Sequence, residues 1–121
     1  MRNNTEVLLI KNNQGGFELI KIDEILLACS DQNYVHIYLA YRKITQHMSF
    51  SELAAWCYWD KMLMKIHRQY MLRFDCIHEI MTGKKEGDYV TLKPQVQEQL
   101  QKLGFAEKTI PLGAEGKILL L

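Results

Sequence analysis

The residues best suited to bind a polyanion lie in one run, from Lys61 to Phe74. It contains four cations and no acid: Lys61, Lys65, Arg68 and Arg73. The amide of Gln69 and the rings of His67 and Tyr70 add groups that hydrogen-bond or stack. Because lysine and arginine pair with phosphate oxygens, this local basic run indicates contact with nucleic-acid phosphates. Composition alone leaves a second interpretation open, in which these are ordinary solvated strand and turn residues.

Other residue patterns give little support for catalysis or metal binding. The sequence has no G-x-G-x-x-G, no Walker loop, no G-x-S-x-G and no H-E-x-x-H motif. The four histidines fall on separate expected strands without helical i, i+4 spacing: His36, His47, His67 and His78. Half-exposed strand histidines explain this spacing better than a metal site does. We therefore expect no enzymatic activity, no cofactor and no metal.

Charge and cysteine content restrict the environment of the chain. Fifteen Lys and Arg against fourteen Asp and Glu leave a net charge of +1, so any basic surface must be local. Cys29, Cys57 and Cys76 are odd in number and lack C-x-x-C spacing, which is typical of buried thiols in a reducing compartment. The apolar run after Glu6 is about five residues long, too short for a signal-peptide core or a membrane span. We expect a cytoplasmic protein without membrane insertion.

Short apolar segments at close spacing predict a mainly β fold in a single domain, residues 1–121. Strands are expected at residues 7–10, 17–22, 25–28, 34–39, 42–47, 62–66, 71–74, 76–81 and 89–92. Residues 34–39 alternate most clearly: Val35, Ile37 and Leu39 face one side, and the intervening residues Tyr34, His36 and Tyr38 face the other. This pattern predicts a strand with one buried face.

Two short helices interrupt the strands. Ser49 and Glu52 have the spacing of a capping box, and the apolar positions that follow predict a helix ending near Asp60. Pro94 at a first helical position and Gly104 as a terminator predict a second helix over residues 94–103. Residues 109–112 and 117–121 read as a last hairpin.

The basic run from Lys61 to Phe74 lies in a segment that resembles a known pattern. Residues 63–77 are similar to the LytTR family motif F-x-R-[IV]-H-R-S-Y-[LI]-V-N-x-x-x-I, with His67, Arg68, Tyr70 and Ile77 in register. Residues 22–27, 33–35 and 49–53 resemble the family's D-I-x-Y-I, G-N-Y-V and S-L-x-E-L segments. Because these similarities follow one another in order over residues 16–92, they are more specific together than any one motif.

The resemblance implies elongated antiparallel β-sheets of LytTR type, with one or two short helices and without catalysis. It implies sequence-specific binding of double-stranded DNA by loops in the major groove, in the output domain of a bacterial two-component or one-component transcription regulator. A receiver or sensor domain and a second module on repeated half-sites are the partners it implies. Carried over by position, the groove-facing residues are Asn33, Lys65, His67, Arg68 and Gln69, with Arg73 as a further candidate. His67 has an alternative role, orienting the loop by a hydrogen bond.

The sequence departs from the family pattern at several positions. Gln69 and Arg73 stand where the family has serine and asparagine. Residues 110–114 keep the proline of the family's P-V-S-R strand but lose its serine and arginine. In this register residues 93–109 form a helical insertion. A second register uses residues 91–93 as the S-R region, with Lys93 as the cation, and both registers remain open.

These departures also leave a second function open. A chain with the family fold, almost no net charge and no C-terminal arginine fits a degenerate module that acts in protein–protein regulation without specific DNA binding.

Overall fold

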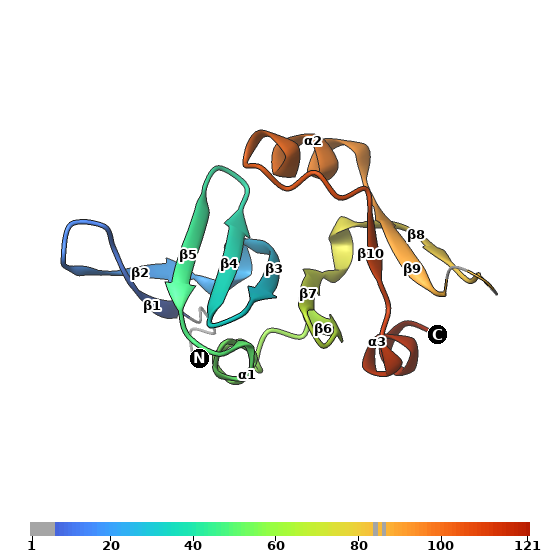
Figure 1. The fold of residues 1–121 in the computed structure, drawn as a ribbon, viewed down its shortest axis with the longest axis horizontal. Helices are drawn as coiled ribbons and strands as arrows, with labels where there is room; N and C mark the ends of the chain where they lie inside the picture. Colours follow the sequence, from blue (N-terminus) through green and yellow to red (C-terminus); the bar gives the residue numbers. More distant parts are fainter. Residues whose placement is uncertain (1–6, 84, 86) are drawn as a thin grey trace, which may run out of the picture.

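The computed structural model describes residues 7–83, 85 and 87–121, which form three antiparallel sheets along an elongated molecule (Figure 1). The prediction of a mainly β fold with elongated antiparallel sheets is therefore confirmed. The single-domain prediction over residues 1–121 also includes residues 1–6, 84 and 86, which lie outside the described part. No helix in the described part is long and apolar enough to cross a membrane.

The first sheet is the expected hairpin of β1 (Val7–Lys11) and β2 (Phe17–Lys21). Its turn is built on Asn12, whose Oδ1 accepts the backbone N–H of Gln14 and of Gly16. Because side chains alternate along a strand, the inner face of the hairpin is buried while its outer face is exposed. Leu8, Ile10 and Ile20 form the inner face, and Val7, Leu9, Phe17 and Leu19 form the outer face.

The central sheet has five strands in the order β5-β4-β3-β7-β6. They are β3 (Ile25–Asp31), β4 (Tyr34–Leu39), β5 (Lys43–His47), β6 (Leu63–His67) and β7 (Tyr70–Arg73). Short 3-10 turns precede β3 (Ile22–Glu24) and follow β7 (Phe74–Cys76). All five strands were predicted within a few residues, because each is a short apolar or alternating segment bounded by turn residues.

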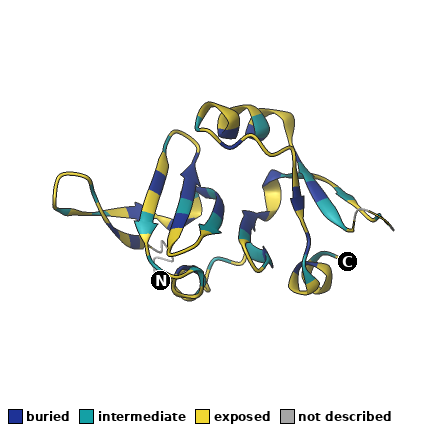
Figure 2. Cartoon of the chain, in the orientation of Figure 1, coloured by how far each residue is buried: buried dark blue, intermediate teal, exposed yellow. Residues whose placement is uncertain are grey.

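Two apolar clusters lie on opposite faces of this sheet. Neighbouring residues of β3 divide between them, Ala28 in one and Leu27 in the other, and Met71 and Leu72 divide in the same way on β7. Figure 2 shows the buried residues concentrated along these central strands. The central sheet is therefore covered on both sides, which is why its strands are largely apolar.

The one-sided prediction for β4 is wrong at Tyr38. Val35, Ile37 and Leu39 are buried as expected, but the Tyr38 side chain is also only 3% exposed. Its ring meets the ring of Phe105 edge-on, with centroids 5.5 Å apart. The second cluster covers this face of β4 with residues far away in sequence, so local alternation could not reveal the burial.

The first helix, α1 (Phe50–Trp56), begins at the predicted cap. The Ser49 hydroxyl accepts the Glu52 backbone N–H at 3.1 Å and donates to the Glu52 carboxylate at 3.3 Å. The helix ends at the C-cap residue Cys57, earlier than the predicted Asp60. Its buried Leu53 attaches it to the first apolar cluster.

The third sheet joins β8 (Ile77–Met81), β9 (Tyr89–Leu92) and β10 (Thr109–Pro111) in the order β10-β9-β8. Between β9 and β10 lies α2 (Pro94–Lys102), which starts at the predicted proline and buries Val96 and Leu100. Residues 93–108 thus form a helix and a loop between two paired strands.

The C-terminal prediction is wrong in one part. Instead of a hairpin partner, the tail forms α3 (Ala114–Leu120), and β10 pairs with β9. Strand β9 provides hydrogen-bond partners for the backbone of residues 109–111. The helix then packs on β6, where the Gly113 N–H donates to the Ile66 carbonyl at 2.8 Å. The strand pattern of residues 117–121 is overridden by this tertiary contact.

Candidate nucleic-acid interface

Two tight turns meet at one end of the central sheet. Gln32 and Asn33 connect β3 to β4, and Arg68 and Gln69 connect β6 to β7. Since β3 lies next to β7 in the sheet, the turns are neighbours, and the Ser30 N–H donates to the Gln69 carbonyl at 3.0 Å. All four turn residues are exposed. We call them the tip.

The structure thus brings together three of the residues predicted from the sequence. Asn33, Arg68 and Gln69 lie in the tip, with an amide, a guanidinium and a second amide free to meet a ligand. Tight two-residue turns hold such side chains at defined positions, because both flanking strands are fixed by ladder hydrogen bonds. The backbone of Gln32 adopts a positive φ of 57°, as turns of this kind require.

His67 lies just behind the tip and positions it. Its Nδ1 accepts the Gln69 N–H at 3.1 Å, and its ring packs at a tilt on Tyr70 with centroids 5.6 Å apart. Burial, and then the charge of Arg68, lower the pKa of His67 below its ordinary value. The lowered pKa favours the neutral ring, in which Nδ1 can accept this hydrogen bond. This favours the alternative in which His67 orients the turn.

Lys65 lies on β6, two residues before His67, and is partly exposed. Its Nζ is 3.7 Å from a carboxylate oxygen of Glu115 and 5.8 Å from the centroid of the Phe50 ring. The ammonium group is thus near the tip, but it already has an anionic neighbour.

Arg73 is buried, and we withdraw it as a DNA-contact candidate. Only 8% of the residue is exposed. Its Nη2 donates to Asp60 Oδ2 at 2.9 Å and to the Ile22 carbonyl at 2.8 Å, while its Nε donates to the Ile25 carbonyl at 2.7 Å. These partners occupy the guanidinium inside the protein. Asp60, the single acid immediately before the basic run, is the sequence signal that could have indicated this pairing.

Lys93 is not brought to the tip. It precedes α2, and its N–H donates to the Cys76 carbonyl at 3.0 Å. Cys76 follows β7 at the end opposite the tip. By contrast, Gly113 packs against His67, so the C-terminal segment of residues 110–114 is the one beside the tip. The structure thus places residues 110–114, and not Lys93, beside the tip.

Two aromatic side chains near the tip were not among the predicted site residues. Tyr34 and His47 are cross-strand partners on β4 and β5, exposed, with ring centroids 5.2 Å apart. His36, two residues further along β4, hydrogen-bonds to Asp31 at 3.1 Å and to Thr45 at 2.9 Å. Only strand pairing places these residues at the same end of the sheet as Arg68.

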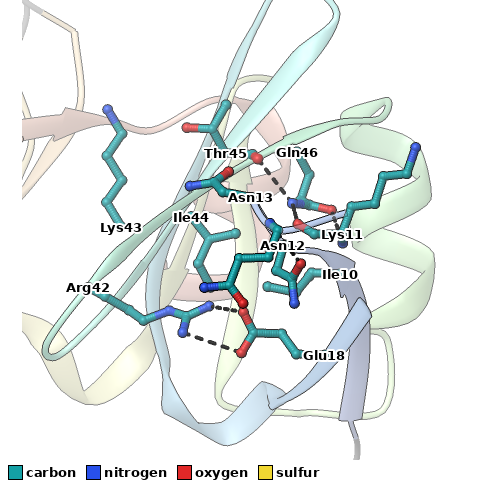
Figure 3. Close-up of a pocket in the computed structure, with 11 residues that line it drawn as sticks. Ile10, Lys11, Asn12, Asn13, Glu18, Arg42, Lys43, Ile44, Thr45 and Gln46 are labelled. Atoms are coloured by element: carbon teal, nitrogen blue, oxygen red, sulfur yellow. Dashed lines mark hydrogen bonds and ion pairs between the residues drawn. The ribbon is translucent and has the colours of Figure 1, made fainter. Parts of the chain in front are cut away.

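A second gathering of polar groups lies between the β1–β2 hairpin and β5 (Figure 3). Arg42 binds both carboxylate oxygens of Glu18, at 2.7 and 3.4 Å. The Gln46 amide pairs with the backbone N–H and carbonyl of Lys11, at 2.9 and 3.0 Å, as a neighbouring strand would. These groups satisfy one another, so their role is to fix the hairpin to the sheet.

Metal and thiol chemistry find no support in the described residues. Within residues 7–83, 85 and 87–121, no group of three or more His, Cys, Asp or Glu side chains is placed to hold a metal ion. Burial raises the pKa of the Cys29 and Cys76 thiols to about 11 and that of Cys57 to about 12. These cysteines are therefore protonated at neutral pH, which makes them poor nucleophiles and poor ligands.

Comparison with known proteins gives two matches and one negative result. The family model of the LytTr DNA-binding domain matches residues 15–101. Among solved structures, the chain is similar to the LytTr DNA-binding domain of a protein described as a methyl-accepting/DNA response regulator from Bacillus cereus. That similarity has a TM-score of 0.63 at 8% identity and covers 96% of this chain and 94% of the other. No curated protein matches the chain.

Proposed function

This chain belongs to the LytTr DNA-binding domain family, and we propose that it binds double-stranded DNA sequence-specifically, as the output domain of a bacterial transcription regulator. The observation that carries the proposal is the tip, where two rigid turns place Asn33, Arg68 and Gln69 side by side on the surface. Exposed side chains of this kind suit contacts in a major groove, where base edges are distinguishable.

Each tip residue has a chemical role in this proposal. Arg68 bonds a guanine edge or a phosphate, while the amides of Asn33 and Gln69 suit adenine. His67 keeps the Arg68–Gln69 turn in shape through its bond to the Gln69 N–H. Lys65 is placed for a phosphate contact beside the groove, in competition with its pairing to Glu115.

The wider setting is part of the same proposal. A receiver or sensor domain delivers the signal, and two modules occupy repeated half-sites on the DNA. We place the protein in the cytoplasm, with residues 1–121 as a single domain in which residues 93–109 are a helical insertion. LytTR domains bind DNA and are not enzymes, so we propose no catalytic activity for this chain.

Replacing Arg68 with alanine tests the site. We expect an affinity loss of about 5- to 150-fold for a duplex selected by the wild-type protein, which corresponds to about 1 to 3 kcal/mol for a base contact. Stability should change by less than about 0.5 kcal/mol, because the side chain is exposed. Fluorescence anisotropy measures the binding, and urea denaturation measures the stability.

The matched control is Lys102→Ala, which also removes one cation, but from the exposed surface of α2. It should leave the affinity nearly unchanged. Equal affinities for Arg68→Ala and Lys102→Ala would remove the tip as the DNA-binding site.

A second function has specific observations in its favour. Ala114 and Glu115 lie beside the tip, in the region where the family pattern has its arginine, and Trp56 and Trp59 are exposed at the end of α1. These features fit a degenerate module in protein–protein regulation. DNA binding falls steeply with salt because phosphate neutralisation releases counterions, whereas a mostly apolar protein contact does not. Salt dependence therefore separates the two functions.

A further inference from the structure

The C-terminal helix α3 is held against the strand that leads to the tip. The Gly113 N–H donates to the Ile66 carbonyl at 2.8 Å. Gly116 lies so close to β6 that a Cβ atom at this position would overlap the Ile66 carbonyl oxygen. This contact is backbone against backbone, so α3 occupies a defined place along β6 (Figure 1).

That placement puts a negative charge next to a cation of the proposed DNA surface. Glu115, in the first turn of α3, has a carboxylate oxygen 3.7 Å from Lys65 Nζ, with the two side chains 60% and 31% exposed. Two other charged groups nearby have ionic partners, while Lys61, which lines the same pocket as Lys65 and Glu115, lies 5.1 Å from the centroid of the Tyr58 ring. Asp60 pairs with Arg73 at 2.9 Å, and Lys117 pairs with Asp88 at 3.2 Å. The Glu115 charge is therefore directed mainly at Lys65.

We propose that Glu115 tunes the affinity for DNA, because it restrains Lys65 and weakens the attraction of the tip region to DNA phosphate. This inference rests on the DNA-binding function proposed above. Phosphate contacts supply essentially all of the affinity for random DNA, whereas base contacts add to it only at the correct sequence. A residue that weakens a phosphate contact thus lowers the affinity for random DNA and for the target by about the same factor, and it lowers the salt dependence of both.

The test is Glu115→Gln, which removes the charge and keeps the shape. If Lys65 gains one phosphate contact, the slope of log affinity against log salt steepens by about 0.9. Lowering the salt from 200 to 50 mM should therefore raise the affinity of Glu115→Gln for random duplex by about threefold more than it raises the affinity of the wild type. For a duplex enriched by the wild type the gain should be about the same, so the ratio of specific to random affinity stays nearly constant.

Two further variants isolate the mechanism. Glu98→Gln makes the same charge change on α2, where Glu98 pairs with Lys102 at 3.8 Å, and it should leave both affinities unchanged. In a Lys65→Ala background, Glu115→Gln should give no gain. Thermal melting checks that each variant is folded.

Two results would overturn the inference while leaving the proposed function intact. In one, Glu115→Gln behaves like Glu98→Gln. In the other, its gain persists without Lys65, so that net charge alone explains it. Wild-type protein that binds neither duplex in a salt-dependent manner would overturn the proposed function, and this inference with it.

Discussion

Replacing Arg73 with methionine is expected to lower the free energy of unfolding by about 3 to 5 kcal/mol, the usual cost of removing one partner from a buried ion pair. The change leaves the Asp60 carboxylate and the Ile22 and Ile25 carbonyls without their guanidinium donor. Methionine fills a similar apolar volume, so the loss reports mainly on these polar contacts. Urea denaturation followed by circular dichroism measures it.

A matched variant, Arg68→Met, makes the same chemical change on the exposed tip and should alter stability by less than about 0.5 kcal/mol. Equal stabilities for the two variants would contradict the buried role of Arg73.

Acid provides a second readout of the Arg73–Asp60 pair. Burial by itself would raise the pKa of Asp60, but hydrogen bonds from Arg73 and from the Met62 and Leu63 amides outweigh it, so the pKa lies below its ordinary value. Because the folded state holds this carboxyl deprotonated, its stabilisation is present above the unfolded pKa of about 3.9 and is lost as pH falls through the lower folded value. The stability difference between wild type and Arg73→Met should therefore shrink in acid.

Replacing Ile66 with aspartate is expected to unfold the domain. Ile66 is fully buried in the second apolar cluster, and its carbonyl accepts the Gly113 N–H that positions α3. An unpaired carboxylate there costs several kcal/mol, which is comparable to the total stability of a small domain, about 5 to 15 kcal/mol. Loss of the β-sheet circular dichroism signal and of cooperative melting is the expected result. Val35→Asp makes the same test of the first cluster.

The control for Ile66→Asp is Ile118→Asp on α3, where the side chain is 83% exposed. This variant should remain folded. A cooperatively folded Ile66→Asp variant would show that the assignment of the β6 faces is reversed.

Local patterns were sufficient to predict most of the fold. The alternation in residues 34–39 gave β4, the Ser49–Glu52 spacing gave the start of α1, and Pro94 gave the start of α2. In each case a short segment contains the physical reason for its own conformation, whether side-chain period or backbone capping. Residues 63–77 likewise identified the β6–β7 hairpin, and with it half of the tip, through family resemblance.

The errors arose where distant segments decide the outcome. Tyr38 is buried by Phe105, Arg73 is turned inward by Asp60 and two carbonyls, and residues 117–121 join a helix that packs on β6. The adjacency of Asn33 to Arg68 also depends on the strand order β4-β3-β7-β6, which no local pattern contains. The sequence is thus sufficient to propose the site residues, but only the pairing of strands in the sheet brings them together.

Sequence-specific DNA binding is tested most directly by selecting, from a random-sequence pool, the duplexes that the wild-type protein binds. Fluorescence anisotropy then measures the affinity for the selected duplexes at two salt concentrations. Our account predicts enrichment of a short repeated motif, with an affinity that falls steeply as salt rises. Weak binding without enrichment, at either salt concentration, would contradict sequence-specific DNA binding and favour the protein–protein alternative.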